Sequence, residues 1–333
     1  MPDYRVEWYD DAPPDRIVFA SAATAKFLPE PLSPGARAAI AWLGRAPVAR
    51  LAIYQPTELH GADGPSGMIG NYGARDVDAA VALLGDASRR LFGEGARRVV
   101  GPMNGSTWAR YRLALPPEPG DPTEPPFFTE PLNPPEYPAH FERAGFAVAA
   151  LYESRIAHDL SVANPRATEG ERLAAERGVR IEPIRMDRFD GELRDMYQAS
   201  LASFADNLYY TPIAWEQFHA MYAPLRDRLD PDMVLLARAR DGTLAGFALA
   251  FADAHVVRGG RPWRVVVKSL ASLPAWRGIG LAGLLVDRVR AVALAKGYGA
   301  VIHALMQAAN KSIRISTHTA RVFRRYALYA RDA

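Results

Sequence analysis

The sequence of 333 residues contains no cysteine. This absence excludes disulfide bonds, thiolate nucleophiles and cysteine-ligated metal sites, although it leaves the cellular compartment open. No apolar stretch approaches the ~20 residues that a membrane-spanning helix requires. Residues 1–18 carry Asp3, Glu7, Asp10, Asp11 and Asp15, where a secretory signal would need a basic patch and an apolar run. We therefore expect a cytoplasmic protein without a membrane anchor.

Charge of one sign is also scarce. Forty Lys and Arg side chains stand against 37 Asp and Glu, which gives a formal net charge of only +3. Lys and Arg do not form runs that alternate with aromatic residues, so a nucleic-acid partner is not expected. The hydrophobic fraction of 49% and the charged fraction of 23% are ordinary for a globular protein. A chain of this length exceeds what a single core usually fills, which predicts two domains.

Three segments interrupt the regular patterns. Residues 116–138 contain ten prolines, which excludes regular helix and central strand, and Phe127–Phe128 within them favours packing or a position at a cleft edge. Residues 161–177 are polar and include a short helical run. We interpret them as a linker between a domain of residues 1–160 and one of residues 178–333. Residues 253–262 are typical of a turn between two strands.

The second half has a clear order of elements. Apolar spacing, together with the hairpin signal Asp241–Gly242, distinguishes helices from strands there. We predict strands at 179–183, 233–239, 243–252, 263–273, 300–306 and 322–329, helices at 189–205, 214–229 and 281–296, and a short helix or turn at 312–317.

The first half repeats this order less clearly. We predict strands at 50–54, 67–72, 97–100 and 146–156, and helices at 77–92 and 136–144. A similar succession of elements in both halves suggests a duplication, although the two halves share little direct identity.

The turn Arg277–Gly278–Ile279–Gly280 lies between a predicted strand and a predicted helix. Glycine lets the backbone approach an anion without a Cβ in the way, and the helix that follows presents free N–H groups and a favourable dipole. Arg277 adds a charge-assisted contact. An isolated turn of this kind is more often an ordinary strand–helix connection, so its surroundings decide the interpretation.

Those surroundings are antiparallel strands, in contrast to the parallel units of a dinucleotide fold, and no Gly-Lys-Ser/Thr follows the turn. The stretch from Lys268 to Ala282, with Asn310 beyond the next strand, resembles the acyl-CoA motif of the GNAT acetyltransferase superfamily. The resemblance covers residues 179–329, and Ala275 departs from it where the family usually has Gln or Arg. It implies an α/β (α+β) fold of two GNAT-like domains, each with a mixed, mostly antiparallel sheet flanked by helices.

The resemblance also implies acetyl-CoA, or another acyl-CoA, as co-substrate. The family's strand before the turn splays from its neighbour and binds pantetheine through its backbone. The implied cofactor residues are Leu270 and Ser272 for pantetheine, Arg277, Gly278, Ile279, Gly280, Leu281 and Ala282 for the pyrophosphate, and Asn310 beside the thioester. Asn310 also suits a helix N-cap, and both roles are compatible.

The general acid and base are not assigned. The family often has a Tyr seven residues after the Asn as general acid to the leaving thiolate, where this chain has Thr317. Ser316, Tyr326 and Tyr329 are substitutes by proximity. Each Tyr also fits a half-buried strand position. The family's usual Glu is replaced by Lys268, which serves as a base if it is desolvated and otherwise as an edge or anion-binding residue. His303 and His318 are alternatives, His303 also fitting a core position, and neither has ligand-spaced partners for a metal.

In the family, the connection between the two early helices sets acceptor specificity. Here it contains Asn207, Tyr209 and Tyr210, which would line an acceptor cleft, and Asp206, which would attract an amine. An aromatic-bearing loop packed on the core is an equally good interpretation.

The first half lacks the Arg-Gly-x-Gly turn and has Asp76 and Asp78 where phosphate would bind. Acidic groups there repel an anion, so we interpret residues 1–160 as a degenerate copy that has lost CoA. Residues 101–108 are rich in turn formers and are either structural or face the acceptor site.

We expect an N-acyltransferase that transfers an acetyl group from acetyl-CoA to a primary amine of a small molecule or peptide. The missing Tyr and Glu keep open a non-catalytic acyl-CoA-binding or sensor protein. A tandem relative that joins an aminoacyl group from a tRNA to a peptide is disfavoured by the near-neutral charge and the intact CoA turn. The acceptor, the oligomeric state and any contribution of the first half to the site are open.

Overall fold

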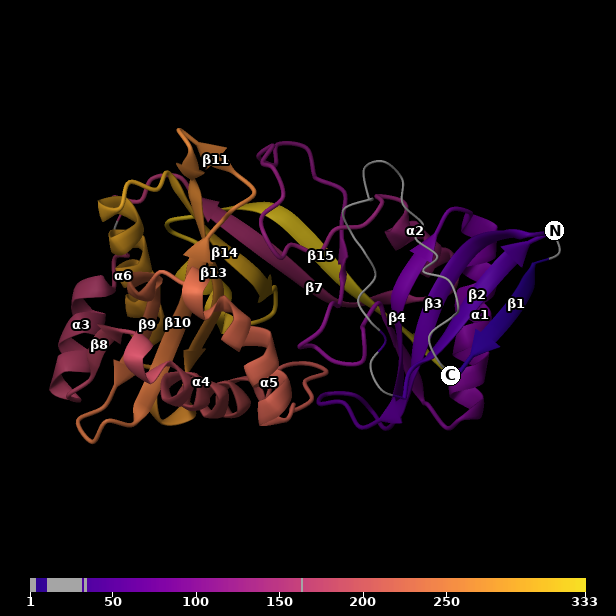
Figure 1. The fold of residues 1–333 in the computed structure, drawn as a ribbon, viewed down its shortest axis with the longest axis horizontal. Coiled ribbons are helices and arrows are strands. Elements are labelled where there is room, and N and C mark those ends of the chain that lie inside the picture. The colour runs from indigo at the N-terminus through magenta and orange to yellow at the C-terminus, as the bar shows by residue number, and fades with distance from the viewer. Residues whose placement is uncertain (1–3, 11–31, 33–34, 163) are drawn as a thin grey trace.

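The computed structural model describes residues 4–10, 32, 35–162 and 164–333. Most of the acidic N-terminal segment, namely residues 1–3 and 11–18, and residue 163 of the expected linker lie outside these residues. A single 13-stranded sheet follows the order β1-β2-β3-β4-β5-β15-β7-β14-β13-β10-β9-β8, and β6 pairs with β15. The molecule is elongated, with the first half at one end and the second half at the other (Figure 1).

The first half matches the predicted order and adds strands that the sequence patterns did not indicate. Two of those strands, β1 and β2, extend the sheet outward from β3 in antiparallel pairs, and the third, β6, pairs with β15. The Ala-rich apolar run of β2 does not alternate, so its periodicity fits a helix as well as a strand. The elements are β1 (Arg5–Tyr9), β2 (Arg37–Leu43), β3 (Ala46–Thr57), β4 (Ser66–Ala74), α1 (Val77–Gly93), β5 (Arg98–Gly101), β6 (Leu113–Ala114), α2 (Tyr137–Arg143) and β7 (Ala147–Ala157).

The predicted elements of the second half are confirmed, with one helix shorter than expected. That helix, α5, ends at Tyr222 and continues as the 3-10 segment Ala223–Arg228, because Pro224 interrupts it. The elements are α3 (Ala167–Glu176), β8 (Arg180–Pro183), α4 (Phe189–Phe204), α5 (Trp215–Tyr222), β9 (Val234–Arg238), β10 (Leu244–Ala252), β11 (Val257–Arg258), β12 (Arg261–Pro262), β13 (Arg264–Ser272), α6 (Leu281–Ala295), β14 (Ala300–Gln307) and β15 (Arg321–Asp332), with short 3-10 helices between several of them.

The last strand of each half lies among the strands of the other half. Strand β7 pairs with β14 and β15, which both belong to the second half. Strand β15 pairs with β5, β6 and β7, which all belong to the first half. Within the described residues neither strand pairs inside its own half, and Figure 1 shows the two long strands crossing the centre of the molecule. The sheet is therefore continuous because its halves exchange their final strands.

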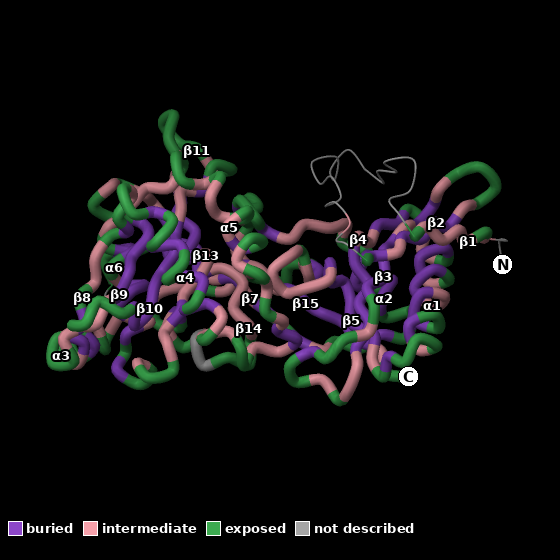
Figure 2. Tube along the Cα trace, turned by 60° about the horizontal axis from the view of Figure 1, so that its bottom comes forward, coloured by how far each residue is buried: buried purple, intermediate pink, exposed green. Residues whose placement is uncertain are grey.

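Helices cover the sheet on both faces in the second half. Helix α6 packs against Val265 and Val267 of β13, and α3 packs against α6. Helices α4 and α5 cover the opposite face, where Phe247 and Leu249 of β10 lie. In the first half, α1 and α2 cover one face. Buried residues gather along the central strands of both halves (Figure 2).

The proline-rich segment packs on the second half, as one of the two interpretations of Phe127–Phe128 predicted. Phe127 is fully buried against Val266 and Phe323. Phe128 contacts the rings of Phe251 and His255 edge-on. An irregular segment of the first half thus belongs to the core of the second.

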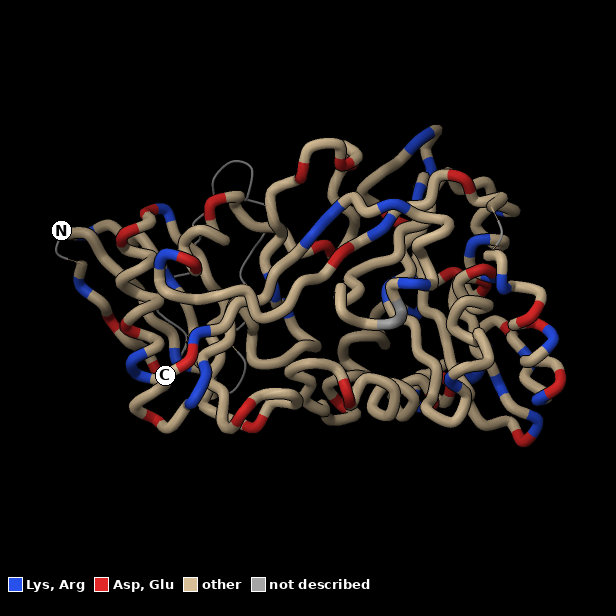
Figure 3. The backbone as a smooth tube through the Cα atoms, turned by 180° about the vertical axis from the view of Figure 1, so that it is seen from behind, with Lys and Arg blue, Asp and Glu red and all other residues tan. Residues whose placement is uncertain are grey.

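The described residues contain no helix long and apolar enough to cross a membrane. Seen from behind, Lys/Arg and Asp/Glu positions are interspersed along both halves of the backbone (Figure 3).

Candidate active site

Strands β13 and β14 separate partway along their length. Their parallel pairing runs from Arg264↔Ala300 to Val267↔His303, whereas the strands continue to Ser272 and Gln307. No further pair joins them among the described residues. Each strand is irregular where they part: the register of β13 against β10 skips Lys268, and Leu305 of β14 has a φ of 57°. The segment after Val267 therefore presents backbone polar groups toward a gap in the sheet.

The glycine turn follows at the end of the splayed strand. Gly278 and Gly280 have φ values of 88° and 77°, which is the left-handed region that favours glycine. Gly280 is the N-cap of α6, no side chain caps the helix there, and its first turn contains no acidic residue. The first N–H groups of α6 are thus oriented toward any anion at the turn, and the helix dipole favours that anion.

Arg277 and α3 support this turn from two sides. The guanidinium of Arg277 donates to the carbonyl oxygen of Ser203 at 3.3 Å and lies 3.7 Å from the carboxylate of Asp206, so the turn adjoins the end of α4. On the other side, a Cβ on Gly280 would lie 3.4 Å from Cα of Gly170 in α3. The helical part of the expected linker therefore packs directly behind the turn.

The first half has the same splay, and its own residues fill it. Pairing of β4 with β5 ends at Met68↔Val100, although β4 continues to Ala74. Beyond that point the N–H of Met103 donates to the Ile69 carbonyl at 2.7 Å. The N–H of Asn71 donates to Oδ1 of Asn104, also at 2.7 Å. We call residues 103–104 the plug, because they take hydrogen-bonding groups of the splayed strand.

The start of α1 is occupied as well. The carboxylate of Asp76 caps the helix by accepting from the N–H of Ala79 at 2.8 Å, and it also accepts from the hydroxyl of Tyr4 at 2.8 Å. These bonds lower the pKa of Asp76, which keeps the carboxylate charged. A carboxylate at this helix terminus repels an anion, and the absence of CoA binding in the first half stays a prediction.

The segment after the plug reaches the second half. The indole N–H of Trp108 donates to the carbonyl oxygen of Thr211 at 2.9 Å. Its ring packs edge-on against Phe204 and Phe218 of α4 and α5. The plug bears out the structural interpretation of residues 101–108, and Trp108 contacts the connection between α4 and α5, whereas the interpretation that the segment faces an acceptor site stays a prediction.

Arg112 continues this segment into the splay of the second half. It is 8% exposed and has a φ of 71°. Its guanidinium carbon lies 3.8 and 4.1 Å from the ring centroids of Tyr111 and Tyr152, whose planes are nearly perpendicular to each other. It donates to the carbonyl oxygen of Leu305 at 3.4 Å. The sequence analysis missed Arg112, because nothing local in the sequence indicates its left-handed backbone or its long-range contacts.

Lys268 is half-buried on the opposite side of the splay. Burial, and secondarily the positive charge of Arg112, lowers the pKa of Lys268 to about 8. A substantial fraction of the amine is therefore neutral in mildly alkaline solution, which satisfies the desolvation condition for a base.

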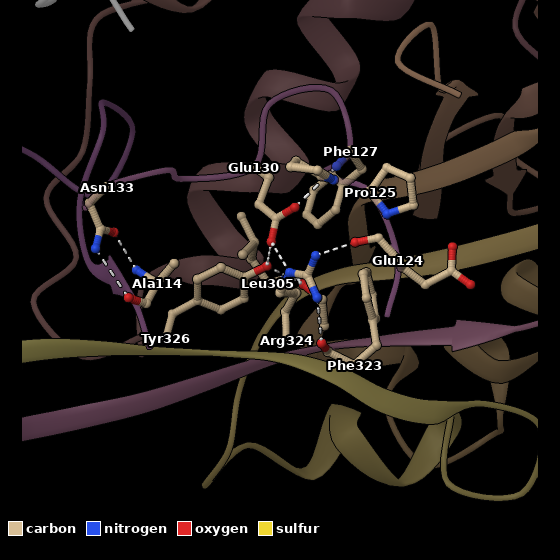
Figure 4. Close-up of polar contacts among 12 residues, drawn as sticks. Ala114, Glu124, Pro125, Phe127, Glu130, Asn133, Leu305, Phe323, Arg324 and Tyr326 are labelled. Carbon is tan, nitrogen blue, oxygen red and sulfur yellow. Dashed lines mark hydrogen bonds and ion pairs between the residues drawn. The ribbon is translucent and has the colours of Figure 1, made fainter. Parts of the chain in front are cut away.

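Tyr326 is separated by Ser154 from Leu305, the irregular residue of β14 at the splay. It belongs to a buried network around Glu130 (Figure 4). Its hydroxyl donates to Oε1 of Glu130 at 2.8 Å. That hydroxyl is 3.2 Å from Oγ of Ser154, which accepts from the N–H of Leu305 at 3.4 Å. Since Tyr326 gives its only proton to Glu130, Ser154 donates to Tyr326. A chain of hydrogen bonds thus connects the irregular residue of β14 to a carboxylate of the proline-rich segment.

The ionisation of this network is shifted by burial. Desolvation, followed by the Glu130 charge, holds the pKa of Tyr326 well above its usual value. Desolvation also raises the pKa of Glu130, although Tyr326 and Arg324 oppose the shift. Tyr326 is fully buried, so its geometry favours positioning of β14 over direct contact with a substrate.

Ser316 is buried in a pair with His303. Its Oγ is hydrogen-bonded to Nδ1 of His303, and the two residues are 1% and 4% exposed. Burial, together with the charges of Arg290 and Arg155, lowers the pKa of His303 to about 4, so the imidazole is neutral. This pair lies toward α6, on the face of the sheet opposite Arg112. This placement agrees with the interpretation of His303 as a buried core residue.

The predicted acceptor residues lie between the two halves. Tyr209 is 1% exposed, its hydroxyl accepts from Arg98 at 3.2 Å, and its N–H donates to the His60 carbonyl at 2.7 Å. Tyr210 packs near Trp108, and burial raises its pKa to about 12. The packing interpretation therefore describes Tyr209, whereas Asn207 is half-buried in the same connection.

The remaining predicted residues lie along one path. Leu270 and Ser272 belong to the splayed part of β13, and the pyrophosphate residues follow at the turn. Asn310 lies just beyond β14 and precedes the 3-10 helix Lys311–Ile315, where its carbonyl oxygen accepts from Ile313 at 3.1 Å. The described residues contain no group of three or more His, Asp or Glu that could hold a metal ion.

A comparison of this sequence with protein families agrees with the geometry of the second half, in which a splayed pair of parallel strands leads to a glycine turn and an uncapped helix. Residues 193–315 match the acetyltransferase (GNAT) family. This part of the chain belongs to the GNAT family. The match confirms the predicted resemblance, although it covers fewer residues than the expected 179–329. No curated protein matches the chain in sequence.

Solved structures extend the GNAT fold to most of the chain. A GCN5-related N-acetyltransferase from Sphaerobacter thermophilus superposes with a TM-score of 0.52 and 15% identity, covering 89% of this chain and 80% of that one. A tandem GNAT protein from the clavulanic acid biosynthesis pathway superposes with a TM-score of 0.50 and 14% identity, covering 90% of this chain and 85% of that one. A fungal multi-domain protein with a glucosamine N-acetyltransferase region superposes with a TM-score of 0.52 and 15% identity, covering 89% of this chain and 33% of that one.

These identities show the fold alone, and this chain spans only a third of the fungal protein. The predicted fold class of two GNAT-like units is confirmed. The individual site residues and the domain boundaries at residues 160 and 178 stay predictions.

Proposed function

We propose that the protein is an N-acyltransferase that transfers an acetyl group from acetyl-CoA to a primary amine at the splay of its second half. The observation that carries this proposal is the contrast between the two halves. The splay and helix terminus of the first half are filled by the plug and Asp76. Their counterparts in the second half keep the glycine turn and an uncapped helix.

The cofactor would follow the path of the predicted residues. Backbone groups at Leu270 and Ser272 would bind the pantetheine arm, and residues 277–282 would bind the pyrophosphate. Asn310 would lie beside the thioester end. Because the splayed strand fixes the thioester relative to the acceptor, positioning alone supplies several kcal/mol of the rate enhancement.

Lys268 is the residue best placed to move a proton. In the proposed reaction the acceptor amine forms a bond to the thioester carbon, the C–S bond breaks, and the amine proton passes to Lys268. The resulting ammonium returns that proton to the departing thiolate. Backbone N–H groups of the splayed strand would stabilise the oxyanion. Ser316 and Tyr326 would act by positioning β14, because both side chains are buried.

The acceptor would be a small molecule or a peptide with a primary amine, and the compartment would be the cytoplasm. The connection of α4 to α5 would contribute Asn207 and Tyr210 to the acceptor side. Trp108 of the first half, which packs on these helices, would complete that side.

Gly278→Ala tests the pyrophosphate site. A Cβ on Gly278 would meet nothing in the protein within 4 Å, so the folding cost is limited to the left-handed backbone, roughly 1–2 kcal/mol. We expect the Kd for acetyl-CoA, measured by calorimetry, to rise at least ~10-fold, because the methyl group enters the place of the phosphate. Gly120→Ala is the matched control, since Gly120 has a φ of 89° and equally open surroundings.

Release of the CoA thiol across a panel of primary amines tests the transfer itself. Turnover on at least one amine, lost in Gly278→Ala and preserved in Gly120→Ala, supports the proposal. Tight acetyl-CoA binding without turnover on any amine would indicate the non-catalytic acyl-CoA sensor. Equal Kd values for the two variants would remove the pyrophosphate site from the turn.

A further inference from the structure

Arg112 has a buried positive charge without a carboxylate partner in the described residues. Its Nε atom is buried and unbonded, and its hydrogen bond goes to the Leu305 carbonyl. Other buried guanidinium groups are paired: Arg264 with Asp253 at 2.6 Å, and Arg290 with Asp287 at 3.1 Å. A buried charge without a counter-ion is costly, so the isolation of Arg112 requires a reason.

The two tyrosine rings explain only part of how the fold tolerates this charge. Each ring contributes about 0.5–2 kcal/mol through a cation–π contact. The left-handed backbone of a bulky residue opposes this by roughly 1–2 kcal/mol. Strain of this kind persists where the surrounding structure imposes it, and it concentrates at functional sites.

The unbonded Nε bears on which ligand the guanidinium can bind. Tyr111 and Tyr152 lie beside the guanidinium with their ring planes nearly perpendicular, and neither ring takes a hydrogen bond from the buried Nε. A guanidinium forms paired, parallel hydrogen bonds with a planar carboxylate. A group bound there would lie beside the Leu305 carbonyl, where β14 leaves β13.

Below its pKa of about 8, before it can act as a base, Lys268 adds a second cation near the same gap. Within the described residues it also has no carboxylate partner, and it is close enough to Arg112 for the two charges to interact. Two positive charges at one end of the splay, without an acid between them, favour an anionic group in the substrate pair.

We propose that Arg112, supplied by the first half, binds a carboxylate of the substrate pair at the acyl-transfer site of the second half. This inference rests on the proposed function. The carboxylate is carried either by the acceptor, as in an amino acid, or by the acyl group, as in a dicarboxylic acid joined to CoA through one end. Arg112 is then a specificity-determining residue. Through it, the first half completes the acyl-transfer site that lies in the second half.

Paired substrates distinguish the two sources. Acceptor pairs are amino acids and their carboxamides, with acetyl-CoA as donor. Donor pairs are succinyl-CoA and butyryl-CoA, with the best acceptor found. The variant is Arg112→Met, which keeps an apolar chain beside the two rings. Arg110→Met is the matched control, because Arg110 is exposed and lies two residues away.

We expect the wild type to prefer the carboxylate member of one pair, and Arg112→Met to raise the KM of that member by about 10- to 100-fold. The KM of the uncharged member and the Kd for acetyl-CoA should be unchanged. Arg110→Met should preserve the preference. Arg112→Met should also raise the Tm, because a buried charge without a partner is replaced by an apolar group.

Other outcomes overturn the inference. These are a wild type without preference, an equal loss on both members of each pair, or a lower Tm in Arg112→Met without any change in preference. If no amine is acylated, calorimetric Kd values for succinyl-CoA and butyryl-CoA, and for the acceptor pairs added to the CoA complex, decide the question. Failed turnover with a retained, Arg112-dependent carboxylate preference would contradict the proposed function and support the anion site.

Discussion

Lys268, Arg112 and Tyr326 show how position changes the chemistry of ordinary side chains. Lys268 sits where β13 loses its register with β10, and burial lowers its pKa to about 8. Arg112 faces it from another part of the chain, and Tyr326 supports β14 from behind through Ser154. The three residues surround one splay, but only Lys268 combines partial exposure with a pKa near neutrality.

Lys268→Met tests whether this amine accepts the proton. Because the folded pKa is lowered from 10.5 to about 8, the neutral fraction grows as the pH rises through 8, and kcat/KM should rise with it. The variant should lose about 10²- to 10⁴-fold in kcat. The pH profile of kcat/KM should also lose its inflection near pH 8 in this variant.

The pH profile must be recorded with the same acceptor for both proteins, because the acceptor amine titrates as well. Arg258→Met, an exposed change on β11, is the control for removal of a positive charge. If the inflection is unchanged in Lys268→Met, the titrating group is the acceptor amine, and Lys268 does not accept the proton in the reaction.

At the scale of elements, the two strand–turn–helix units differ in what fills them. The plug bonds to β4 and leads into Trp108 and Arg112, which contact the second half. The unit of the first half thus uses its splay to anchor a segment that contacts the other unit. Gly70 makes this possible, since a Cβ there would lie 2.5 Å from the Met103 carbonyl oxygen.

Gly70→Ala should displace the plug. Because the nearest atoms include backbone of residues 103–104, the segment must shift, at a cost of about 1–3 kcal/mol in the free energy of unfolding. We expect a lower Tm and weaker acceptor binding, since the plug precedes Trp108 and Arg112. The Kd for acetyl-CoA should change little, because the turn at residues 277–280 lies in the other half.

Gly191→Ala is the control, because a Cβ in this helical position meets nothing within 4 Å and should be neutral or stabilising. If the affinity for acetyl-CoA fell as far as that for the acceptor, the plug would support the whole molecule instead of the acceptor side.

At the scale of the whole molecule, strand exchange and the proline-rich segment join the halves. Strand β7 pairs with strands of the second half and β15 with strands of the first. Arg264 and Asp253, both fully buried, lie in the second half, and Arg264 also donates to the carbonyl oxygens of Pro125 and Pro126 in the first. We therefore expect the protein to unfold in one cooperative transition.

Arg264→Met should lower the midpoint of that transition. The change leaves the Asp253 carboxylate buried without its counter-ion, which costs about 3–5 kcal/mol. The double variant Arg264→Met, Asp253→Asn should recover much of the loss, because the amide oxygen can still accept from the N–H groups of Phe128 and His255. Urea unfolding followed by circular dichroism measures both.

The exposed pair Arg288–Glu171, at 2.7 Å, provides the control. Arg288→Met should cost at most about 1 kcal/mol, as exposed ion pairs do. Two separate transitions in the wild type, or equal effects of Arg264→Met and Arg288→Met, would contradict the coupling of the halves through the buried pair.

The sequence by itself determined what depends on local order. The period of apolar residues located most helices and strands, and the turn Arg277–Gly280 before a helix predicted a CoA site, because glycine backbone freedom and a helix terminus are local properties. Asp76 and Asp78 likewise predicted that the corresponding helix start in the first half repels an anion. The Ala-rich strand β2 was missed because its pattern does not distinguish helix from strand.

The tertiary structure alone decided which residues meet. The exchange of β7 and β15, the plug in the first splay and the approach of Arg112 to Leu305 join residues up to 234 positions apart, and sequence spacing contains no information on such contacts. Burial, which sets the pKa of Lys268 and of His303, is likewise a property of the packed molecule. The turn proposed to bind the cofactor was therefore visible in the sequence, whereas the groups around the proposed acyl end became visible only in the fold.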